Sequence, residues 1–184
     1  MIRSNKNLFE ESFEAWKEGM TGVPFIDACM RQVNATGYMS NRGRQNVASF
    51  FVFELELDWR LGAAYFEEVL IDHDVASNYG NWLAAANLLG GRKNRFNITK
   101  QSMDYDPEGR FIRKWVPELQ NVPISKLFEP WKMSHKEMSK ARCLIGEDYP
   151  ENMVELIGWN PSGKKKKKGK RWHQGKGDKK YYTS

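Results

Sequence analysis

The spacing of apolar residues constrains the fold more than any other feature of this sequence. In residues 24–37, PFIDACMRQVNATG, apolar positions recur at i, i+1, i+4, i+5 and i+8, which places them on one face of a helix. These positions are Phe25, Ile26, Cys29, Met30 and Val33. Pro24 suits a first helical turn and Gly37 suits a helix end. The segment is therefore predicted to form an amphipathic helix.

Residues 42–71 carry apolar side chains on nearly every face, most densely from Val47 to Leu57. We expect one buried helix here and, after the Asp58-Trp59-Arg60 tripeptide, a second. The aromatic and β-branched run SFFVF also suits a buried strand, but the length of the segment and its lack of turn residues favour helix.

The rest of the chain divides into shorter segments. Residues 83–89 favour helix, whereas residues 90–109 look loop-like, with turn residues at both ends. Short helices are expected in residues 110–119 and after Pro130. Because no internal repeat and no convincing alternating strand is found, the body is predicted to be an all-α helical bundle.

The composition changes at about Asn160, where Gly, Lys and Ser replace the periodic apolar residues. Such a segment cannot bury enough apolar surface to fold, so residues 160–184 are expected to form a disordered basic tail. The helical domain is assigned to residues 15–150, and residues 1–14 are treated as a lead-in.

The net charge of +6 comes from this tail. Residues 164–184 hold ten of the 29 basic and one of the 23 acidic residues, which leaves 19 basic against 22 acidic residues in the rest. The globular part is not a basic protein, so any affinity it has for nucleic acid must come from a local patch. The tail could attract phosphates in a salt-sensitive way, or serve only as a solubilising or localisation segment.

The cysteine and histidine content predicts no metal site. Cys29 and Cys143 lie far apart in no metal-ligand spacing, and His135 and His173 have no partners at such a spacing. No secretory signal or membrane-length apolar run is found, so a soluble protein of a reducing, intracellular compartment is expected. Cytoplasm, nucleus, chloroplast and mitochondrion all remain open.

Residues 71–82, IDHDVASNYGNW, are unusually rich in polar and aromatic chemistry. Carboxylates, an imidazole, amides and an indole fall within them: Asp72, His73, Asp74, Asn78, Asn81 and Trp82. One interpretation is a helix boundary at which the two carboxylates only cap and turn the chain. A general base at His73 is also conceivable, although a structural histidine is the more common case. The other interpretation is a ligand site.

Five motifs resemble the second half of the FAD domain of the photolyase and cryptochrome family, in unbroken order from about Ala15 to Trp131. They are TGVPFIDACMRQVNATGYMSNRGRQNVASFF, LDWR, LIDHDVASNYGNW, RFNITKQSMDYDPEG and WVPEL. MSNRGRQN and DHDVASNYGNW are most similar to the DASH branch. The resemblance implies a helical bundle that holds FAD. It does not cover the antenna domain or the first half of the flavin domain, so we expect a fragment or a shortened relative without an antenna-chromophore site.

The resemblance also implies the flavin-binding residues, which are Asn41, Arg44, Asp72, Asp74 and Asn78. Within this set Arg44 would pair with Asp72, and Asn78 would face ring atom N5. The rim of a flavin ring presents donors and acceptors, so carboxylates, amides and a guanidinium suit it. A neutral amide can bond to N5 without titrating, which suits an anionic reduced flavin.

The same motifs imply contacts with nucleic acid and an electron relay. Arg42 would point toward DNA and Gln45 would line the lesion pocket, although NRGR could equally begin a helix with solvated cations. Trp82 and Trp59 match the first and second indoles of a relay that photoreduces the flavin.

The sequence departs from the family at two sites. The third indole of the relay is expected near residue 6, where the chain reads Asn5-Lys6-Asn7. Ala84 stands where repair enzymes carry an aromatic that stacks on the flipped dimer, a contact worth about 1–3 kcal/mol per base. Trp16, Trp115 and Trp131 are expected to be core or helix-packing residues.

The function implied is that of a DASH-type cryptochrome or photolyase: light-driven electron transfer from reduced FAD to cyclobutane pyrimidine dimers, preferably in single-stranded DNA, or blue-light sensing. Repair would be a deoxyribodipyrimidine photo-lyase activity in which the cofactor does the chemistry. The alternative is a truncated, flavin-free module that binds nucleic acid or signals through its basic tail.

Overall fold

The computed structural model describes residues 5–90, 95–154 and 156, and the side chains from Phe9 onward. In chain order the elements are α1 (Asn5–Glu18), α2 (Pro24–Thr36), α3 (Asn41–Phe53), α4 (Trp59–Val69), α5 (Val75–Ala85), α6 (Ile98–Tyr105), α7 (Arg110–Trp115), η1 (Pro117–Leu119), α8 (Ile124–Leu127), η2 (Pro130–Lys132) and α9 (His135–Ala141). The described part of the chain contains no strand, only an isolated bridge between Ile145 and Tyr149. The all-α prediction is confirmed.

The residues at their ends explain where α2 and α3 begin and where α2 stops. Pro24 opens α2, and Gly37 closes it with a φ of 68° and a hydrogen bond from its N–H to the carbonyl of Val33. Ser40 caps α3 by accepting from the N–H of Gly43 at 3.2 Å. The predicted helix over residues 24–37 and the two predicted in residues 42–71 are thereby confirmed.

An aromatic part of the core joins α1, α3 and α5, within a larger buried cluster that extends over α2 to the C-terminal described segment. Trp16, Phe51 and Trp82 are at most 2% exposed, and their ring centroids lie 4.6–6.3 Å apart. The expected core role of Trp16 is confirmed. Because aromatic rings bury large apolar areas, this cluster fixes how these three helices pack on one another.

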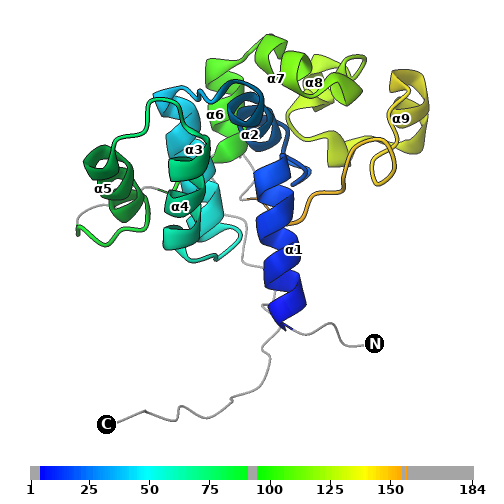
Figure 1. Ribbon diagram of the computed structural model, residues 1–184. Coiled ribbons are helices and arrows are strands. Elements are labelled where there is room, and N and C mark those ends of the chain that lie inside the picture. Colours follow the sequence, from blue (N-terminus) through cyan, green and yellow to red (C-terminus); the bar gives the residue numbers. More distant parts are fainter. Residues whose placement is uncertain (1–4, 91–94, 155, 157–184) are drawn as a thin grey trace.

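At one end of the molecule α5 packs against α4 and α3, while α9 lies at the other end (Figure 1). The α4–α5 contact depends on Gly62, where a Cβ would lie 2.2 Å from the Trp82 ring. The missing side chain therefore lets the indole lie directly on the backbone of α4.

Residues 90–109 were predicted to be loop-like, and this is wrong for their second half, which forms α6. Asn97 caps this helix by accepting a hydrogen bond from the N–H of Lys100 at 2.9 Å. The inner face of the helix, with Ile98 and Ser102, is buried. Only eight residues are helical, so the apolar period is too short to stand out in the sequence. The turn at its end is present, with the Asp106 carboxylate accepting from the N–H groups of Phe111 and Ile112.

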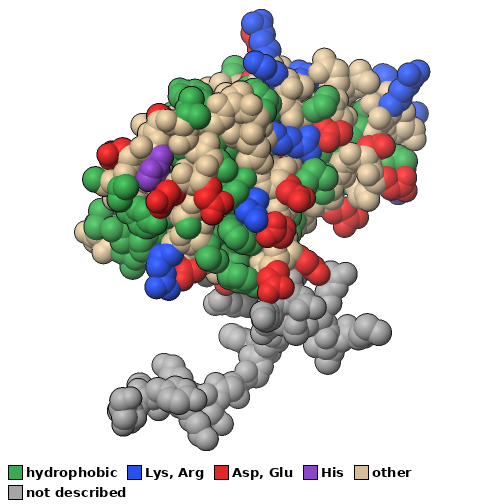
Figure 2. Space-filling view, viewed as in Figure 1, with side chains coloured by type: hydrophobic (Ala, Val, Ile, Leu, Met, Phe, Trp, Pro, Cys, Tyr) green, Lys and Arg blue, Asp and Glu red, His purple; other side chains and the backbone are tan. Residues whose placement is uncertain are grey.

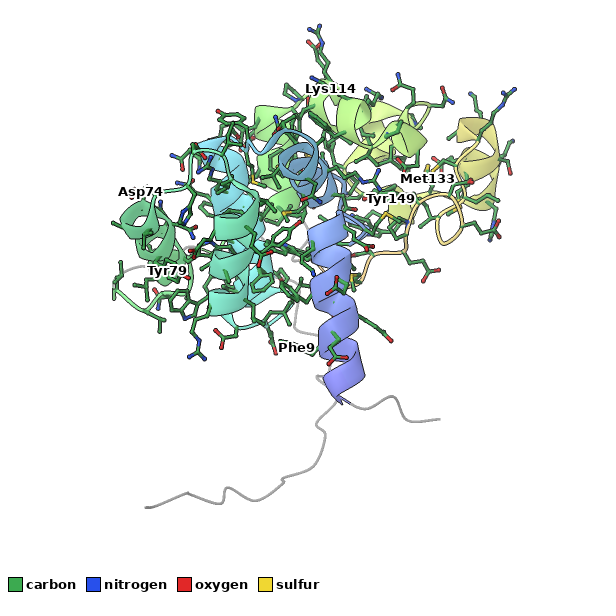
Figure 3. The ribbon with its side chains drawn as sticks, in the orientation of Figure 1. Phe9, Asp74, Tyr79, Lys114, Met133 and Tyr149 are labelled. Atoms are coloured by element: carbon green, nitrogen blue, oxygen red, sulfur yellow. The ribbon has the colours of Figure 1, made fainter. Side chains whose placement is uncertain are left out.

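A buried polar network fastens the C-terminal described segment to α2. Asp27 is fully buried and accepts hydrogen bonds from the N–H and hydroxyl of Thr21 and from the phenol of Tyr149. Burial raises the pKa of Asp27, and the hydrogen bonds from Thr21 and Tyr149 lower it in part. Tyr149 lies on the C-terminal side of α9 near α1 and α2 (Figure 3). The predicted tail, residues 160–184, lies outside the described residues.

Candidate functional site

A cavity of about 210 Å³ lies between α3, α5 and the connection from α4 to α5. Its polar lining consists of Asn41, Arg44, Gln45, Asp72, His73, Asp74, Ser77, Asn78 and Asn81. All five predicted flavin-binding residues are in this set, although they come from two segments about 30 positions apart in the sequence. Arg42 and Trp59 do not line the cavity.

Arg44 and Asp72 join the two segments. The Arg44 Nη2 atom lies 2.7 and 2.8 Å from the two carboxylate oxygens of Asp72, and Nε donates to the carbonyl of Met39 at 2.8 Å. The Met39 contact fixes the guanidinium plane, so the charge cannot swing away from the cavity. The Asp72 side chain is 49% exposed, and a pair this accessible adds little to folding stability. The pair therefore orients polar groups more than it holds the fold.

Asp74 begins α5. Its carboxylate accepts from the N–H of Ser77 at 2.8 Å, and this bond holds the pKa of Asp74 below its ordinary value. The capping interpretation of residues 71–82 thus holds for Asp74 but not for Asp72, which pairs across to α3. Figure 3 shows Asp74 at the start of α5 and Tyr79 farther along the same helix. A hydrogen bond to the Ser77 side chain lowers the pKa of Asp74 further.

Asn78 presents one defined group to the cavity. The side chain is 8% exposed, and its Nδ2 donates to the backbone carbonyl of Ala63 at 2.9 Å. One N–H of the nitrogen is thus bound to α4, while Oδ1 is an acceptor that can face a ligand. A ligand with an N–H or O–H at that point can donate to this oxygen.

The remaining cavity walls suit a flat ring. Apolar side chains line it from several elements: Ala48, Phe66, Leu70, Trp82, Ala85 and Phe96. The Nε2 atom of His73 is buried at the cavity without a hydrogen-bond partner, a costly state that a bound polar ligand would relieve. Apolar walls with convergent polar groups fit a tricyclic ring with a polar rim, such as a flavin. The volume is below the roughly 300–1,000 Å³ of complete ligand pockets, so the fit is to part of FAD.

Arg42 lies beside this cavity. Its Nη1 donates to the Oε1 of Gln45 at 2.9 Å, and its guanidinium carbon lies 4.8 Å from the centroid of the Tyr105 ring. Gln45 lines the cavity, and Tyr105 is 53% exposed. The two residues predicted to meet nucleic acid are thus bonded to each other at the rim. Tyr105 was not predicted, because the contact joins α3 to the unforeseen α6.

The two indoles of the predicted relay have different surroundings. Trp82 lines the cavity and is 2% exposed, whereas Trp59 is half-buried and its ring contacts Tyr79 at 6.3 Å. Among the described residues no ring contact joins Trp59 to Trp82. Ala84 lines the cavity at the position where repair enzymes of the family are expected to carry an aromatic residue. The small side chain leaves that wall without a stacking ring.

The described residues hold neither a metal-ligand cluster nor a membrane-spanning helix. In the described ranges, no three His, Cys, Asp or Glu side chains gather closely enough to hold a metal ion. No helix among those residues is both long and apolar enough to cross a bilayer.

The fold and cavity define an all-α domain built around a partly enclosed site for a flat ring with a polar rim. Residues 2–176 match the family described as the FAD-binding domain of DNA photolyase. The chain is 49% identical over 168 residues to a cryptochrome DASH of Danio rerio, covering 85% of this chain and 32% of that protein. It is 52% identical over 150 residues to a cryptochrome DASH of Xenopus laevis, covering 80% and 29%.

Solved structures agree with these relatives. A cryptochrome of Synechocystis superposes with a TM-score of 0.78 at 49% identity, covering 79% of this chain and 31% of that one. A class III photolyase of Agrobacterium tumefaciens gives a TM-score of 0.74 at 38% identity, with the same shares covered. The chain belongs to the photolyase and cryptochrome family of FAD-binding domains, and its relatives include the DASH cryptochromes. It spans about a third of the length of the curated relatives that it matches.

Proposed function

We propose that this chain forms one wall of the FAD site of a DASH-type cryptochrome or photolyase, with the flavin-domain portion assigned to residues 15–150. The observation that carries the proposal is the convergence of Arg44, Asp72 and Asn78 on one cavity from two separate segments. Since α1 starts at Asn5, the lead-in of residues 1–14 shares a helix with that portion.

The residues of the cavity have distinct tasks in this proposal. Asp72, held by Arg44, offers carboxylate oxygens to N–H groups on the ring rim, and Asn41 and Asp74 bound the same edge. Asn78 offers Oδ1 to N5, which favours a protonated N5. Trp82 and the apolar walls exclude water from the ring faces. When bound, FAD supplies the light absorption and the one-electron chemistry.

Activity toward DNA belongs to the whole protein. We propose that Arg42 and Gln45 contact single-stranded DNA carrying cyclobutane pyrimidine dimers, and that Trp82 and Trp59 conduct electrons to the flavin. Blue-light sensing would use the same cavity residues. Apolar side chains gather on the surface over the α5 end of the molecule (Figure 2). Exposed apolar residues next to and within α5 are Ile71, Val75, Leu88 and Leu89, and we propose that further flavin-domain segments cover them.

An absorbance spectrum of the purified chain tests the proposal. Near-stoichiometric flavin absorption supports it. A colourless protein that binds no added FAD but still binds single-stranded DNA supports the alternative, a flavin-free module acting through its basic tail. For that alternative, deleting residues 164–184 should flatten the salt dependence of DNA binding, because ten cations leave with the segment.

A further inference from the structure

A line of aromatic side chains leads from the cavity to the surface, through residues that the predicted relay does not include. Trp82 lines the cavity, and its ring centroid lies 6.3 Å from that of Trp16, with the planes at 73°. Trp16 in turn lies 5.7 Å from Tyr65, at 64°. Aromatic rings in contact have centroids about 4.5–7 Å apart, so both pairs touch edge to face.

We propose that Trp82, Trp16 and Tyr65 form an electron-transfer route from the protein surface to the cavity. The route rests on the proposed function for its natural acceptor, photoexcited oxidised FAD. It runs from α5 through α1 to α4, whereas the predicted Trp59 relay stays within α4 and α5.

The chemistry of the neighbouring rings selects Trp16 as the next carrier. Trp82 also contacts Phe51 at 5.6 Å and Phe66 at 5.3 Å, but a benzene ring is much harder to oxidise than an indole. Trp16 is fully buried, and its Nε1–H has no hydrogen-bond acceptor. An oxidised Trp16 therefore cannot release its proton to a neighbour, so it remains a strong oxidant that draws an electron from Tyr65.

Tyr65 has the properties of a terminal donor. It is half-buried on α4, and its hydroxyl donates to the Oδ1 of Asn34 at 2.7 Å. Asn34 is exposed, which gives the phenolic proton a path to water. Burial also raises the pKa of Tyr65, so the phenol is protonated in the resting protein.

The electrons and protons balance over the route. One electron leaves Tyr65 and reaches the acceptor at the cavity through Trp16 and Trp82, and the O–H bond of Tyr65 breaks as its proton passes to solvent. An external thiol then returns one hydrogen atom to the phenoxyl radical and is oxidised to its disulfide after pairing with a second thiyl radical.

The route can be tested without flavin, by placing a photo-oxidant at the cavity. Cys29 and Cys143 are both buried, so a cysteine at the exposed cavity position, Asn81→Cys, can be labelled selectively with a ruthenium tris(bipyridine) maleimide. A light flash with a soluble cobalt(III) complex oxidises the ruthenium centre, which then withdraws an electron from the protein. We expect a tyrosyl radical in electron paramagnetic resonance spectra.

Variants of the labelled chain assign that radical. Tyr65→Phe, which removes only a hydroxyl, should reduce the tyrosyl signal to background, and Trp16→Phe should do the same. Tyr79→Phe is the matched control, because Tyr79 contacts Trp59, and it should leave the signal intact. An unchanged signal in Tyr65→Phe, or a lost signal in Tyr79→Phe, would overturn the route.

The assay separates this proposal from the flavin assignment. A Tyr65-dependent radical in a chain that binds no FAD would support the route and contradict the proposed function. A chain that binds FAD but forms its radical independently of Tyr65 would support the proposed function and contradict the route.

Discussion

At the scale of single residues, Asn78 shows how one hydrogen bond defines the chemistry of the site. One N–H of its amide is bonded to the carbonyl of Ala63, which holds the side chain in place while its oxygen can accept a hydrogen bond from a ligand. The carboxylate of an aspartate would bring two acceptors against that carbonyl. The identity of this residue thus affects both the packing of α5 on α4 and the polarity of the cavity.

We predict that Asn78→Asp lowers the free energy of unfolding by about 1–3 kcal/mol, because it leaves a buried carbonyl without its donor. Asn81→Asp is the control on the same helix, since Asn81 is exposed and has no side-chain hydrogen bond among the described residues. It should change stability by less than about 0.5 kcal/mol. Urea titrations would measure both, and equal losses would contradict the role given to Asn78.

Sequence reasoning about single residues succeeded where the family resemblance supplied the partner of a residue. Arg44 with Asp72 followed from the family resemblance, and the structure brings the two within hydrogen-bond distance. The contact of Trp16 with Trp82 could not be predicted in the same way. It depends on how α1 crosses the bundle, and a buried indole in a sequence carries no sign of its neighbour.

At the scale of elements, the α4–α5 contact positions the site, and it depends on a glycine. Gly62→Ala should lower the free energy of unfolding by about 1–3 kcal/mol, because the added methyl group overlaps the Trp82 ring.

Gly80→Ala on the facing helix is the matched control. No atom lies within 4 Å of its Cβ position, so the change should be neutral or stabilise by up to about 1 kcal/mol through helix propensity. Thermal unfolding would compare the two variants. A stable Gly62→Ala protein with unaltered Trp82 fluorescence would show that the helices do not pack as closely as described.

The start of α5 should depend on pH through Asp74. The Ser77 N–H bond lowers the pKa of Asp74 in the folded protein below 3.8, its ordinary value. The cap therefore stabilises the helix fully above pH 3.8, and its contribution disappears as the pH falls through the lower, folded-state pKa.

The Ser77 amide resonance in nuclear magnetic resonance spectra would report this transition. Asn also caps helices but does not titrate, so the resonance in Asp74→Asn should show no such acid transition. If wild type and variant titrated alike, another group would be responsible.

Element prediction found the short helices in residues 110–119 and after Pro130 but failed for two others, α6 and α8. The period of α2 extends over 13 residues and was recognised, whereas α6 and the four-residue α8 contain too few turns to reveal a stripe. Asn97 caps α6, and tertiary burial holds both helices, through Ile98 in α6 and Leu127 in α8. A single sequence does not display such tertiary contacts.

At the scale of the whole molecule, the Asp27 network closes the bundle. It joins positions 122 residues apart, which no local pattern could have predicted. We predict that Tyr149→Phe lowers the free energy of unfolding by about 1–3 kcal/mol, because the buried carboxylate loses a donor.

Tyr105→Phe removes a hydroxyl from an exposed ring and should change stability by less than about 0.5 kcal/mol. Urea unfolding would measure both variants, and their midpoints can be compared if the dependence of the unfolding free energy on urea concentration has the same slope in both. If Tyr149→Phe were as stable as Tyr105→Phe, the C-terminal segment would not be fastened through Asp27.

The most direct test of the flavin assignment is a calorimetric titration of the purified chain with FAD, comparing wild type with Asp72→Ala. Asp104→Ala is the control, since Asp104 forms an exposed ion pair with Lys100 on α6, away from the cavity. We predict one FAD per wild-type chain and per control chain. Asp72→Ala should bind at least about tenfold more weakly, a loss of about 1.4 kcal/mol, while its unfolding free energy changes by less than about 1 kcal/mol. Equal FAD affinity in Asp72→Ala and wild type, or no binding by the wild-type chain, would contradict the account.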